Sequence, residues 1–175
     1  MIHRGGVDLS PQDNEGRNVI SWAAQQLDVR VLEYLLKSDP LGARTKDAHG
    51  WSPFAWTMDP PERLANAIAL LPHVPEADHE NGSGLSMFAL AVSWKSFGIA
   101  KLLISQEKFS VNESSLDGRT AISYAAEVGH VGLVRQLLTV ESLDVNIADL
   151  HGMTPYSFAA AGHHDEVCRL LQQRL

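Results

Sequence analysis

The sequence contains very little cysteine: a single residue, Cys168, in 175. One thiol cannot close an internal disulfide, so the chain is not a disulfide-stabilised secreted scaffold. Cys168 lies within an apolar helical pattern, which predicts a small buried side chain rather than a reactive thiol. A reducing compartment is therefore favoured, and we expect a cytoplasmic or nuclear protein.

Basic residues are also in short supply. The chain has 14 Lys and Arg against 21 Asp and Glu, a formal net charge of −7. General binding to nucleic acid needs clustered Lys and Arg that neutralise phosphates, so no nucleic-acid partner is expected. Apolar runs long enough to cross a bilayer are missing, and Met1–Arg4 does not resemble a secretory signal. No membrane attachment is expected.

A regular interval is what the sequence does contain. Glycines recur every 34 residues, at Gly16, Gly50, Gly84, Gly118 and Gly152. Two positions after each glycine comes a side chain whose oxygen can cap a helix: Asn18, Ser52, Ser86, Thr120 and Thr154. A fixed period of this length is typical of stacked repeat arrays.

Each repeat contains two short helical patterns. In the first, small pairs such as Ala125-Ala126 permit close packing of neighbouring helices. In the second, an apolar stripe is predicted to be buried; it comprises Val31/Leu35/Leu36, Leu64/Ile68/Leu71, Ile99/Leu103/Ile104, Leu133/Leu137/Leu138 and Val167/Leu170/Leu171. Asp28 is expected to cap the second helix of the first unit. In the second unit, Asp59 followed by Pro60 predicts an early start of the second helix.

The runs 115–138 and 149–171 resemble the ankyrin repeat, whose pattern is D-x-x-G-x-T-P-L-H-x-A-A-x-x-G-H-x-x-[IV]-V-x-L-L-L. The resemblance extends over about five units and nearly the whole chain. It implies an all-α ankyrin-repeat solenoid of stacked helix-turn-helix units with projecting β-turn or hairpin fingers. The His of T-P-L-H, which ties adjacent turns together in the family, is replaced by Ser21, Ala55, Ala89, Ser123 and Ser157. That hydrogen-bond network must be weaker or rebuilt. The Ser-Trp-Ala-Ala and Ser-Tyr-Ala-Ala variants are similar to repeats of large fungal multidomain proteins.

One domain, 1–175, is predicted. Residues 1–12 form a partial repeat or N-terminal cap, four repeats span 13–46, 47–80, 81–114 and 115–148, and 149–175 form a C-terminal repeat or cap. Because an array needs polar outer faces at both ends, the start within a repeat indicates either a segment of a longer protein or a degenerate cap. We expect a monomer when the segment is isolated.

Chemistry at a metal or catalytic site is not expected. His164 and Cys168, four residues apart, could share a helix face as metal ligands. However, His164 has the repeat phase of His130, the inter-helix His of the family, and Cys168 that of Val134. The repeat-position serines have no base in phase with them, and Asp165-Glu166 fit a helix start. No cofactor, metal or enzyme activity is therefore predicted.

The resemblance implies a partner protein that lies along the concave side, formed by the fingers and by the first helices, or palm. The predicted partner-binding residues follow by repeat phase: Arg17, His49, Trp51, Leu85, Leu116, Asp117, Arg119 and Met153 at the fingertips, and Trp94 and Glu127 in the palm. Further fingertip positions are Glu15, Ser83, Leu150 and His151, and further palm positions are Gln25, Gln26, Asp59, Ser93 and Val128. Trp and Arg often dominate binding energy.

The four tryptophans receive different predictions. Trp51 and Trp94 are expected to be exposed binding residues, with the alternative that they fold back onto their own units. Trp22 and Trp56 share the phase of Leu90, Tyr124 and Phe158, which predicts that both are core.

Two other functions stay open. One is a structural spacer or self-stacking segment of a larger protein. The other is an enzyme, which would need a cleft lined by ionisable residues such as His49, Asp59 and Glu127.

Overall fold

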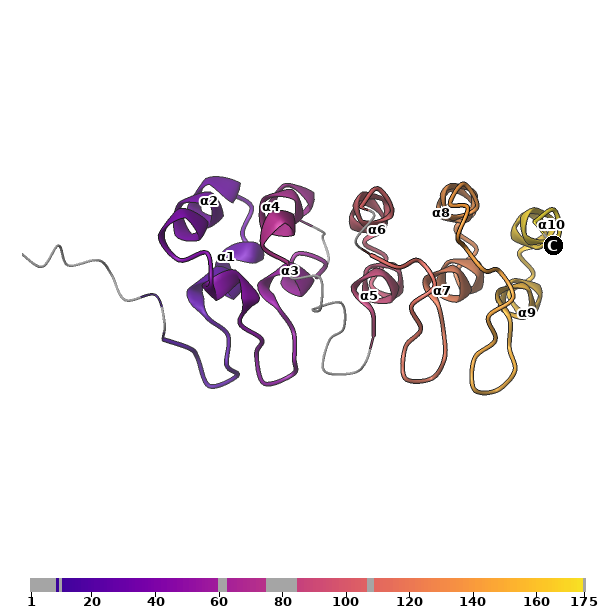
Figure 1. Ribbon diagram of the computed structural model, residues 1–175, viewed down its shortest axis with the longest axis horizontal. Helices are drawn as coiled ribbons and strands as arrows, with labels where there is room; N and C mark the ends of the chain where they lie inside the picture. The colour runs from indigo at the N-terminus through magenta and orange to yellow at the C-terminus, as the bar shows by residue number, and fades with distance from the viewer. Residues whose placement is uncertain (1–8, 10, 60–62, 75–84, 107–108, 175) are drawn as a thin grey trace, which may run out of the picture.

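A computed structural model describes residue 9 and residues 11–59, 63–74, 85–106 and 109–174. Within these residues the chain forms two parallel rows of short helices, with long turns projecting below the inner row (Figure 1). The predicted all-α repeat solenoid is confirmed.

The inner row consists of α1 (Val19–Ala24), α3 (Pro53–Trp56), α5 (Met87–Ser93), α7 (Ala121–Glu127) and α9 (Pro155–Ala161). The outer row consists of α2 (Val29–Ser38), α4 (Leu64–Leu70), α6 (Phe97–Ile104), α8 (Val131–Leu137) and α10 (Asp165–Gln172), with short 3-10 turns η1 (Gly42–Arg44) and η2 (Leu71–His73). Each inner helix packs on the next inner helix and on its own outer partner. The core is therefore a thin seam that runs the length of the array.

The inner helices begin where the repeat phase predicts. The side chains of Asn18, Ser86 and Thr154 accept hydrogen bonds from the third N–H of their helices. Ser52 and Thr120 occupy the same N-cap position without such a bond. The position is thus common to all five units, while the side-chain cap is present in three of them.

The linkers between inner and outer helices differ in how well they were predicted. Asp28 caps α2 by accepting the N–H of Arg30, as expected. The early start of the fourth helix involves Pro60, which lies outside the described residues; α4 itself begins at Leu64. His130 accepts the N–H of Leu133 through Nδ1 at 3.0 Å, and His164 Nε2 lies 2.9 Å from the Glu127 carbonyl. Both histidines thus make the structural contacts expected of the inter-helix position.

The buried stripe of the outer helices holds in most units and fails in two places. Leu35, Leu103, Leu133, Leu137 and Val167 are buried as predicted. In the second unit the predicted Leu71 is buried, at the start of η2, whereas Leu64 and Ile68 are exposed and the buried residues of α4 are Asn66, Ala67 and Leu70. The reason is Asn66, whose amide donates to the carbonyls of Ala23, Ala24 and Gln26 and so fixes the rotation of the helix. Val31 of α2 is also exposed, at 50%.

The repeat-position serines rebuild part of the missing histidine network. Ser21, Ser123 and Ser157 each place Oγ 3.1–3.2 Å from the side-chain oxygen of the N-cap residue. Cys168 is half-buried and packs against the core. No helix in the described ranges has the length and apolar character needed to span a membrane.

Candidate functional site

The projecting turns, here called fingers, share one hydrogen-bond pattern. In the first finger, Asp13 N donates to the Arg17 carbonyl and Gly16 N donates to the Asp13 carbonyl, both at 2.9 Å. The same pair of bonds recurs from Asp47, Ser115 and Asp149. The glycines of these four fingers have φ between 75° and 83°, while Gly84 lies outside the described residues. The fingers are therefore built alike and hold the residues beside them at fixed positions.

Neighbouring fingers are also joined to one another. Ala48 N donates to the Glu15 carbonyl at 2.8 Å, and Leu150 N donates to the Asp117 carbonyl at 2.9 Å. These bonds fix the spacing between the first and second fingers and between the fourth and fifth. A partner would meet a preformed surface, which lowers the entropic cost of ordering on binding.

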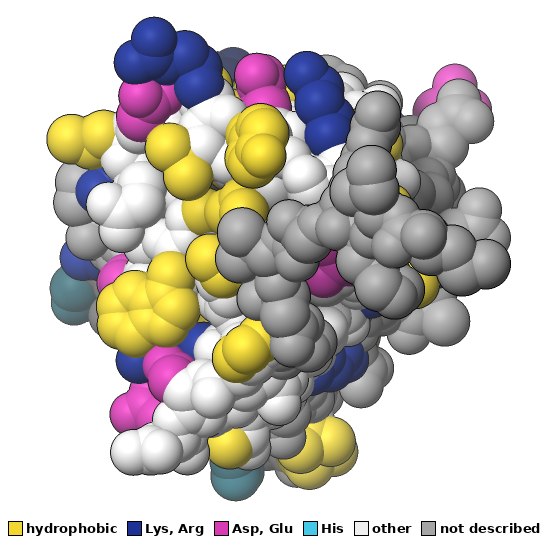
Figure 2. Space-filling view, turned by 90° about the vertical axis from the view of Figure 1, so that its left-hand side faces the viewer, with side chains coloured by type: hydrophobic (Ala, Val, Ile, Leu, Met, Phe, Trp, Pro, Cys, Tyr) yellow, Lys and Arg dark blue, Asp and Glu magenta, His cyan; other side chains and the backbone are white. Residues whose placement is uncertain are grey.

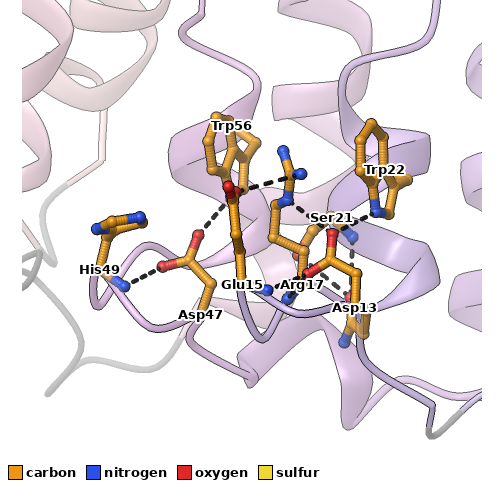
Figure 3. Close-up of polar contacts among 9 residues, drawn as sticks. Asp13, Glu15, Arg17, Ser21, Trp22, Asp47, His49 and Trp56 are labelled. Atoms are coloured by element: carbon orange, nitrogen blue, oxygen red, sulfur yellow. Dashed lines mark hydrogen bonds and ion pairs between the residues drawn. The ribbon is translucent and has the colours of Figure 1, made fainter.

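Arg17 lies at the base of the first finger, as Figure 3 shows. Its guanidinium carbon is 4.0 Å from the ring centroid of Trp22 and 5.3 Å from that of Trp56 in the next unit. Asp13 and Glu15 pair with it at 3.0 and 3.3 Å. Asp13 also accepts the indole N–H of Trp22, and Asp47 accepts that of Trp56. Arg17 therefore ties two repeats together.

Arg119 repeats this arrangement in the fourth unit. Its guanidinium lies 4.0 Å from the Tyr124 ring and 4.2 Å from the Phe158 ring of the next unit. Glu127 pairs with Arg119 at 2.6 Å, and only 14% of the Arg119 side chain is exposed. Both arginines were predicted as fingertip contacts; in the structure they mainly brace adjacent units. The signal was in the sequence, because an aromatic residue follows each arginine by five positions.

The prediction that both Trp22 and Trp56 are core is wrong for Trp22, whereas Trp56 is partly buried and packs against the core. Trp22 is 44% exposed because no unit of the described chain covers its outer face, and Trp56 is half-buried. Both rings instead flank Arg17. At the equivalent repeat positions, Tyr124 and Phe158 flank Arg119 in the same way. Leu90 is the one residue of this repeat position that is buried.

Trp51 and Trp94 form a cluster with Trp56. The ring centroids of Trp51 lie 4.7 Å from Trp56 and 4.8 Å from Trp94, in edge-to-face arrangements. Both Trp51 and Trp94 are partly buried against the core. Trp51 packs on Trp56 of its own unit, as the fold-back alternative expects, but its contact with Trp94 joins the second and third units. His49, exposed on the second finger, has its ring 6.0 Å from that of Trp51.

The most exposed apolar side chains of the described fingers are two leucines. Leu116 is 76% exposed and Leu150 is 77% exposed, at equivalent positions of the fourth and fifth fingers. Beside Leu116 is a notch of about 290 Å³ lined by Leu85, Ser115, Leu116, Asp117 and Tyr124. The structure thus brings three predicted residues, Leu85, Leu116 and Asp117, to one place. Hydrogen bonding from Ser115 lowers the pKa of Asp117, so its carboxylate is ionised at neutral pH.

The remaining predicted residues do not join that notch. Met153 is half-buried at the base of the fifth finger, and Glu127 is engaged by Arg119. Ser83, a predicted fingertip residue, lies outside the described residues. Of the ten predicted residues, His49, Trp51 and Trp94 lie together in the second and third units, and Leu85, Leu116 and Asp117 line the notch. The other four, which do not line the notch, are Arg17, Arg119, Glu127 and Met153.

The side chains suggested for catalysis are occupied elsewhere. Asp59 accepts the amide of Gln25 at 3.0 Å, Glu127 pairs with Arg119, and His49 lies beside Trp51. In the part of the chain that the structure describes, no group of three His, Cys, Asp or Glu could hold a metal ion.

Stacked helix pairs with regular projecting fingers define an α-helical repeat array. A family model described as ankyrin repeats, in three copies, matches residues 87–174, half of the sequence. The chain belongs to the ankyrin repeat family, as its sequence pattern predicted. Ankyrin repeats are generally protein–protein interaction modules and typically lack enzyme activity. A search of curated proteins gives no significant match.

Proposed function

We propose that this chain binds a partner protein on its concave finger-and-palm surface, with the main contact at the fourth and fifth fingers. The observation on which this rests is the pair Leu116 and Leu150, each more than three-quarters exposed and joined through the Leu150–Asp117 backbone bond. Large apolar side chains held rigidly in water are typical of interaction sites.

Burial of these leucine side chains against the partner would supply binding free energy. Fully burying a leucine side chain is worth about 1.5–3 kcal/mol relative to leaving it exposed. The neighbouring notch has apolar walls in Leu85 and Tyr124 and an ionised carboxylate in Asp117. An apolar side chain of the partner fits this notch, with a hydrogen-bond donor directed at Asp117.

The tryptophan cluster extends the proposed surface toward the N-terminal half. Trp51 and Trp94 retain an exposed edge beside His49 on the second finger. In this proposal they offer a second contact, while Arg17, Arg119, Glu127 and Met153 contribute chiefly by holding the fingers in position.

The test is a comparison of bound proteins. The chain and its Leu116→Ser/Leu150→Ser variant are used as baits, and captured proteins are quantified by mass spectrometry. A specific partner should be depleted at least about tenfold with the variant, since hot-spot truncations cost about 2 kcal/mol or more. Both leucines are exposed, so circular dichroism should show an unchanged fold.

A matched control is Leu41→Ser, which replaces a leucine that is 70% exposed after the outer helix α2. It should leave capture unchanged. Normal capture by a folded Leu116/Leu150 variant would remove the basis of the site assignment. A Trp51→Ala/Trp94→Ala variant tests the second contact, and its unfolding curve must be recorded because both rings pack on the core.

Binding rather than catalysis is proposed, supported by the separate engagement of His49, Asp59 and Glu127. A cytoplasmic or nuclear location is part of the proposal, supported by the single cysteine. A self-stacking role is the second candidate, and the half-exposed Val31 of α2 favours it.

A further inference from the structure

The carboxylates at the base of the first and second fingers accept hydrogen bonds on both oxygens. Oδ1 of Asp13 and Oδ1 of Asp47 each accept backbone N–H groups of their own finger. Oδ2 of Asp13 accepts the indole N–H of Trp22 at 3.1 Å. Oδ2 of Asp47 accepts the indole N–H of Trp56 at 3.0 Å, and Figure 3 shows both carboxylates with these bonds. These two carboxylates are therefore engaged within the array and have little left to offer a partner.

Basic side chains accompany the other acidic residues of the first unit. Arg17 pairs with Glu15 at 3.3 Å, and Arg30 pairs with Asp28 at 2.6 Å. Figure 2 views the array from the end where the first unit lies, and Lys or Arg side chains adjoin Asp or Glu side chains on the described part of that face. The negative charge of this unit is thus compensated locally.

The fourth and fifth fingers leave carboxylate oxygens open. Asp117 accepts the Ser115 hydroxyl and the backbone N–H of Arg119, both at Oδ1. Asp149 accepts two backbone N–H groups of its own finger, also at Oδ1. Where the first two units have an indole N–H to bind Oδ2, the fifth unit has Phe158, which has no donor. Within the described residues, Oδ2 of Asp117 and Oδ2 of Asp149 accept no hydrogen bond.

The charges of these two fingers are also unbalanced. Residues 115–119 and 149–153 contain two carboxylates, Asp117 and Asp149, and one guanidinium, that of Arg119. Glu127 of α7 already pairs with Arg119 at 2.6 Å, so this guanidinium does not neutralise both finger carboxylates. The two fingers are joined by the bond from Leu150 N to the Asp117 carbonyl, which keeps their carboxylates on neighbouring turns. A positively charged partner group is favoured at this place.

The notch beside Leu116 combines an open carboxylate with apolar walls. It is lined by Leu85, Leu116 and Tyr124 in addition to Asp117, and its volume is about 290 Å³. A purely apolar occupant would take water away from the carboxylate without replacing the lost hydrogen bonds, which is costly. Protonation offers little relief, because the hydrogen bond from Ser115 lowers the pKa of Asp117. The occupant therefore needs an apolar body and a charged donor in one side chain.

Lysine meets this requirement better than arginine does. Its aliphatic stem packs on apolar surface while the ammonium stays at a polar group. Arginine gains most from a carboxylate when it binds both oxygens, but Oδ1 of Asp117 is already used by Ser115 and Arg119. The face of Tyr124 is likewise in use, since the Arg119 guanidinium lies 4.0 Å from that ring. A compact ammonium needs only the one open oxygen.

We propose that the notch binds a lysine side chain of the partner protein, with the stem between Leu85 and Leu116 and the ammonium at Oδ2 of Asp117. This inference rests on the proposed binding function and names the residue that the notch accepts. Asp149 on the neighbouring finger attracts positive charge to the same place. The partner segment is thus a basic one, and charge selects it in addition to apolar contact.

A random peptide library selected on the immobilised full chain supplies the probe. The selected peptides should contain lysine, and their dissociation constants are measured by fluorescence anisotropy. Asp117→Asn should raise the dissociation constant at least about tenfold, because a hydrogen-bonded ion pair is lost. Asparagine keeps Oδ1 as an acceptor for Ser115 and Arg119, so the circular dichroism spectrum should not change.

A change in the peptide completes the test. Replacing its lysine by norleucine keeps the stem and removes the charge, and should weaken binding to the wild type as much as Asp117→Asn does. The same peptide should lose nothing further with the Asp117→Asn chain, since the two groups act as one pair. Glu33→Gln is the control, because Glu33 is exposed on α2 and its replacement changes the net charge equally. This control should leave the dissociation constant unchanged.

The outcomes separate this inference from the proposed function. Peptides that need Leu116 and Leu150 but bind Asp117→Asn as tightly as the wild type would overturn the lysine assignment alone. Full binding by the norleucine peptide would do the same, as would a gain when arginine replaces the lysine. A library that yields no binder, or binders indifferent to Leu116→Ser/Leu150→Ser, would contradict the binding site itself and the lysine assignment with it.

Discussion

Single residues at the base of the fingers join consecutive repeats. Arg17 and Arg119 are long cationic side chains, yet only 17% and 14% of their side-chain surface is exposed. A guanidinium is planar and weakly hydrated, so it can lie over an aromatic ring while its N–H groups reach a carboxylate. An ammonium group cannot make both contacts in this geometry.

Arg119→Lys should therefore destabilise the fold although the charge is kept. We expect the free energy of unfolding in urea to fall by about 1–2 kcal/mol, because stacking on Tyr124 and Phe158 is lost. Arg135→Lys is the control, since Arg135 is 59% exposed and its pair with Glu166 lies on the surface. That change should cost less than about 0.5 kcal/mol. Equal losses in the two variants would contradict a bracing role for Arg119.

Asp28 gives a pH-dependent prediction. Hydrogen bonds from the Arg30 side chain lower the pKa of Asp28 from 3.8 to about 2. Because the folded-state pKa is the lower one, the stabilising effect is complete above the unfolded value and disappears as pH falls from 3.8 toward 2. Asp28→Asn keeps an oxygen for capping but loses the charge. The variant should be slightly less stable than the wild type at neutral pH. This difference in the free energy of unfolding should disappear as pH falls from 3.8 toward 2.

Urea unfolding at a series of pH values measures this difference. An Arg30→Gln background is the control, where Asp28→Asn should have little further effect because the partner is absent. A wild-type advantage that persists below pH 2 would show that the Arg30 pair is not its cause.

At the scale of the element, the fingers depend on glycine for two different reasons. Gly118 and Gly152 have φ values of 83° and 77°, a region that residues with a Cβ rarely adopt. A Cβ on Gly118 would lie 3.0 Å from Asp149 Cα and from Leu150 N, whereas one on Gly152 would meet nothing within 4 Å. The fourth finger is crowded by the fifth, and the fifth has an open side.

Gly118→Ala should consequently be more damaging than Gly152→Ala. The conformational cost alone is about 1–2 kcal/mol and applies to both. Gly118→Ala should lose roughly 1 kcal/mol or more beyond this, because backbone atoms of the next finger must move. Urea unfolding of the two variants checks the order, and a larger loss for Gly152→Ala would refute the crowding explanation.

The outer helix α4 shows how tertiary contacts override an apolar pattern. Leu64, Ile68 and Leu71 have helical spacing, and the sequence predicted them as the buried stripe; Leu71 is buried, but Leu64 and Ile68 are exposed. The amide of Asn66 satisfies three carbonyls at the end of α1, and this contact turns Ala67 and Leu70 inward instead. Unsatisfied buried carbonyls are costly, so the polar contact decides the rotation.

At the scale of the whole molecule, a residue's contribution depends on its layer in the stack. Val31 and Val167 occupy the same repeat position in the first and fifth units, but one is 50% exposed and the other is completely buried. Val167→Ala should cost about 2 kcal/mol, from two lost methyl groups and the cavity they leave. Val31→Ala should cost less than about 1 kcal/mol, because half of the side chain is already exposed.

Thermal or urea unfolding of the two variants measures these costs. Similar losses for Val31→Ala and Val167→Ala would contradict the dependence on exposure.

The sequence by itself determined the repeat period, the all-α class, the family and the start of each inner helix. These follow from local signals, namely a turn glycine, a cap residue and small apolar pairs, which act within one unit. It also predicted that Leu85, Leu116 and Asp117 belong to the fingers, because the finger position is fixed by phase, and the three residues line one notch.

Only the tertiary structure decided which of these positions are free. Arg17 and Arg119 are held between rings of two units, Trp51 and Trp94 pack on each other, and Trp22 is exposed because the described chain places no unit on its outer side. Each of these outcomes depends on the neighbouring layer. Burial in a stacked array is a property of pairs of units, and the pattern within a single repeat does not contain it.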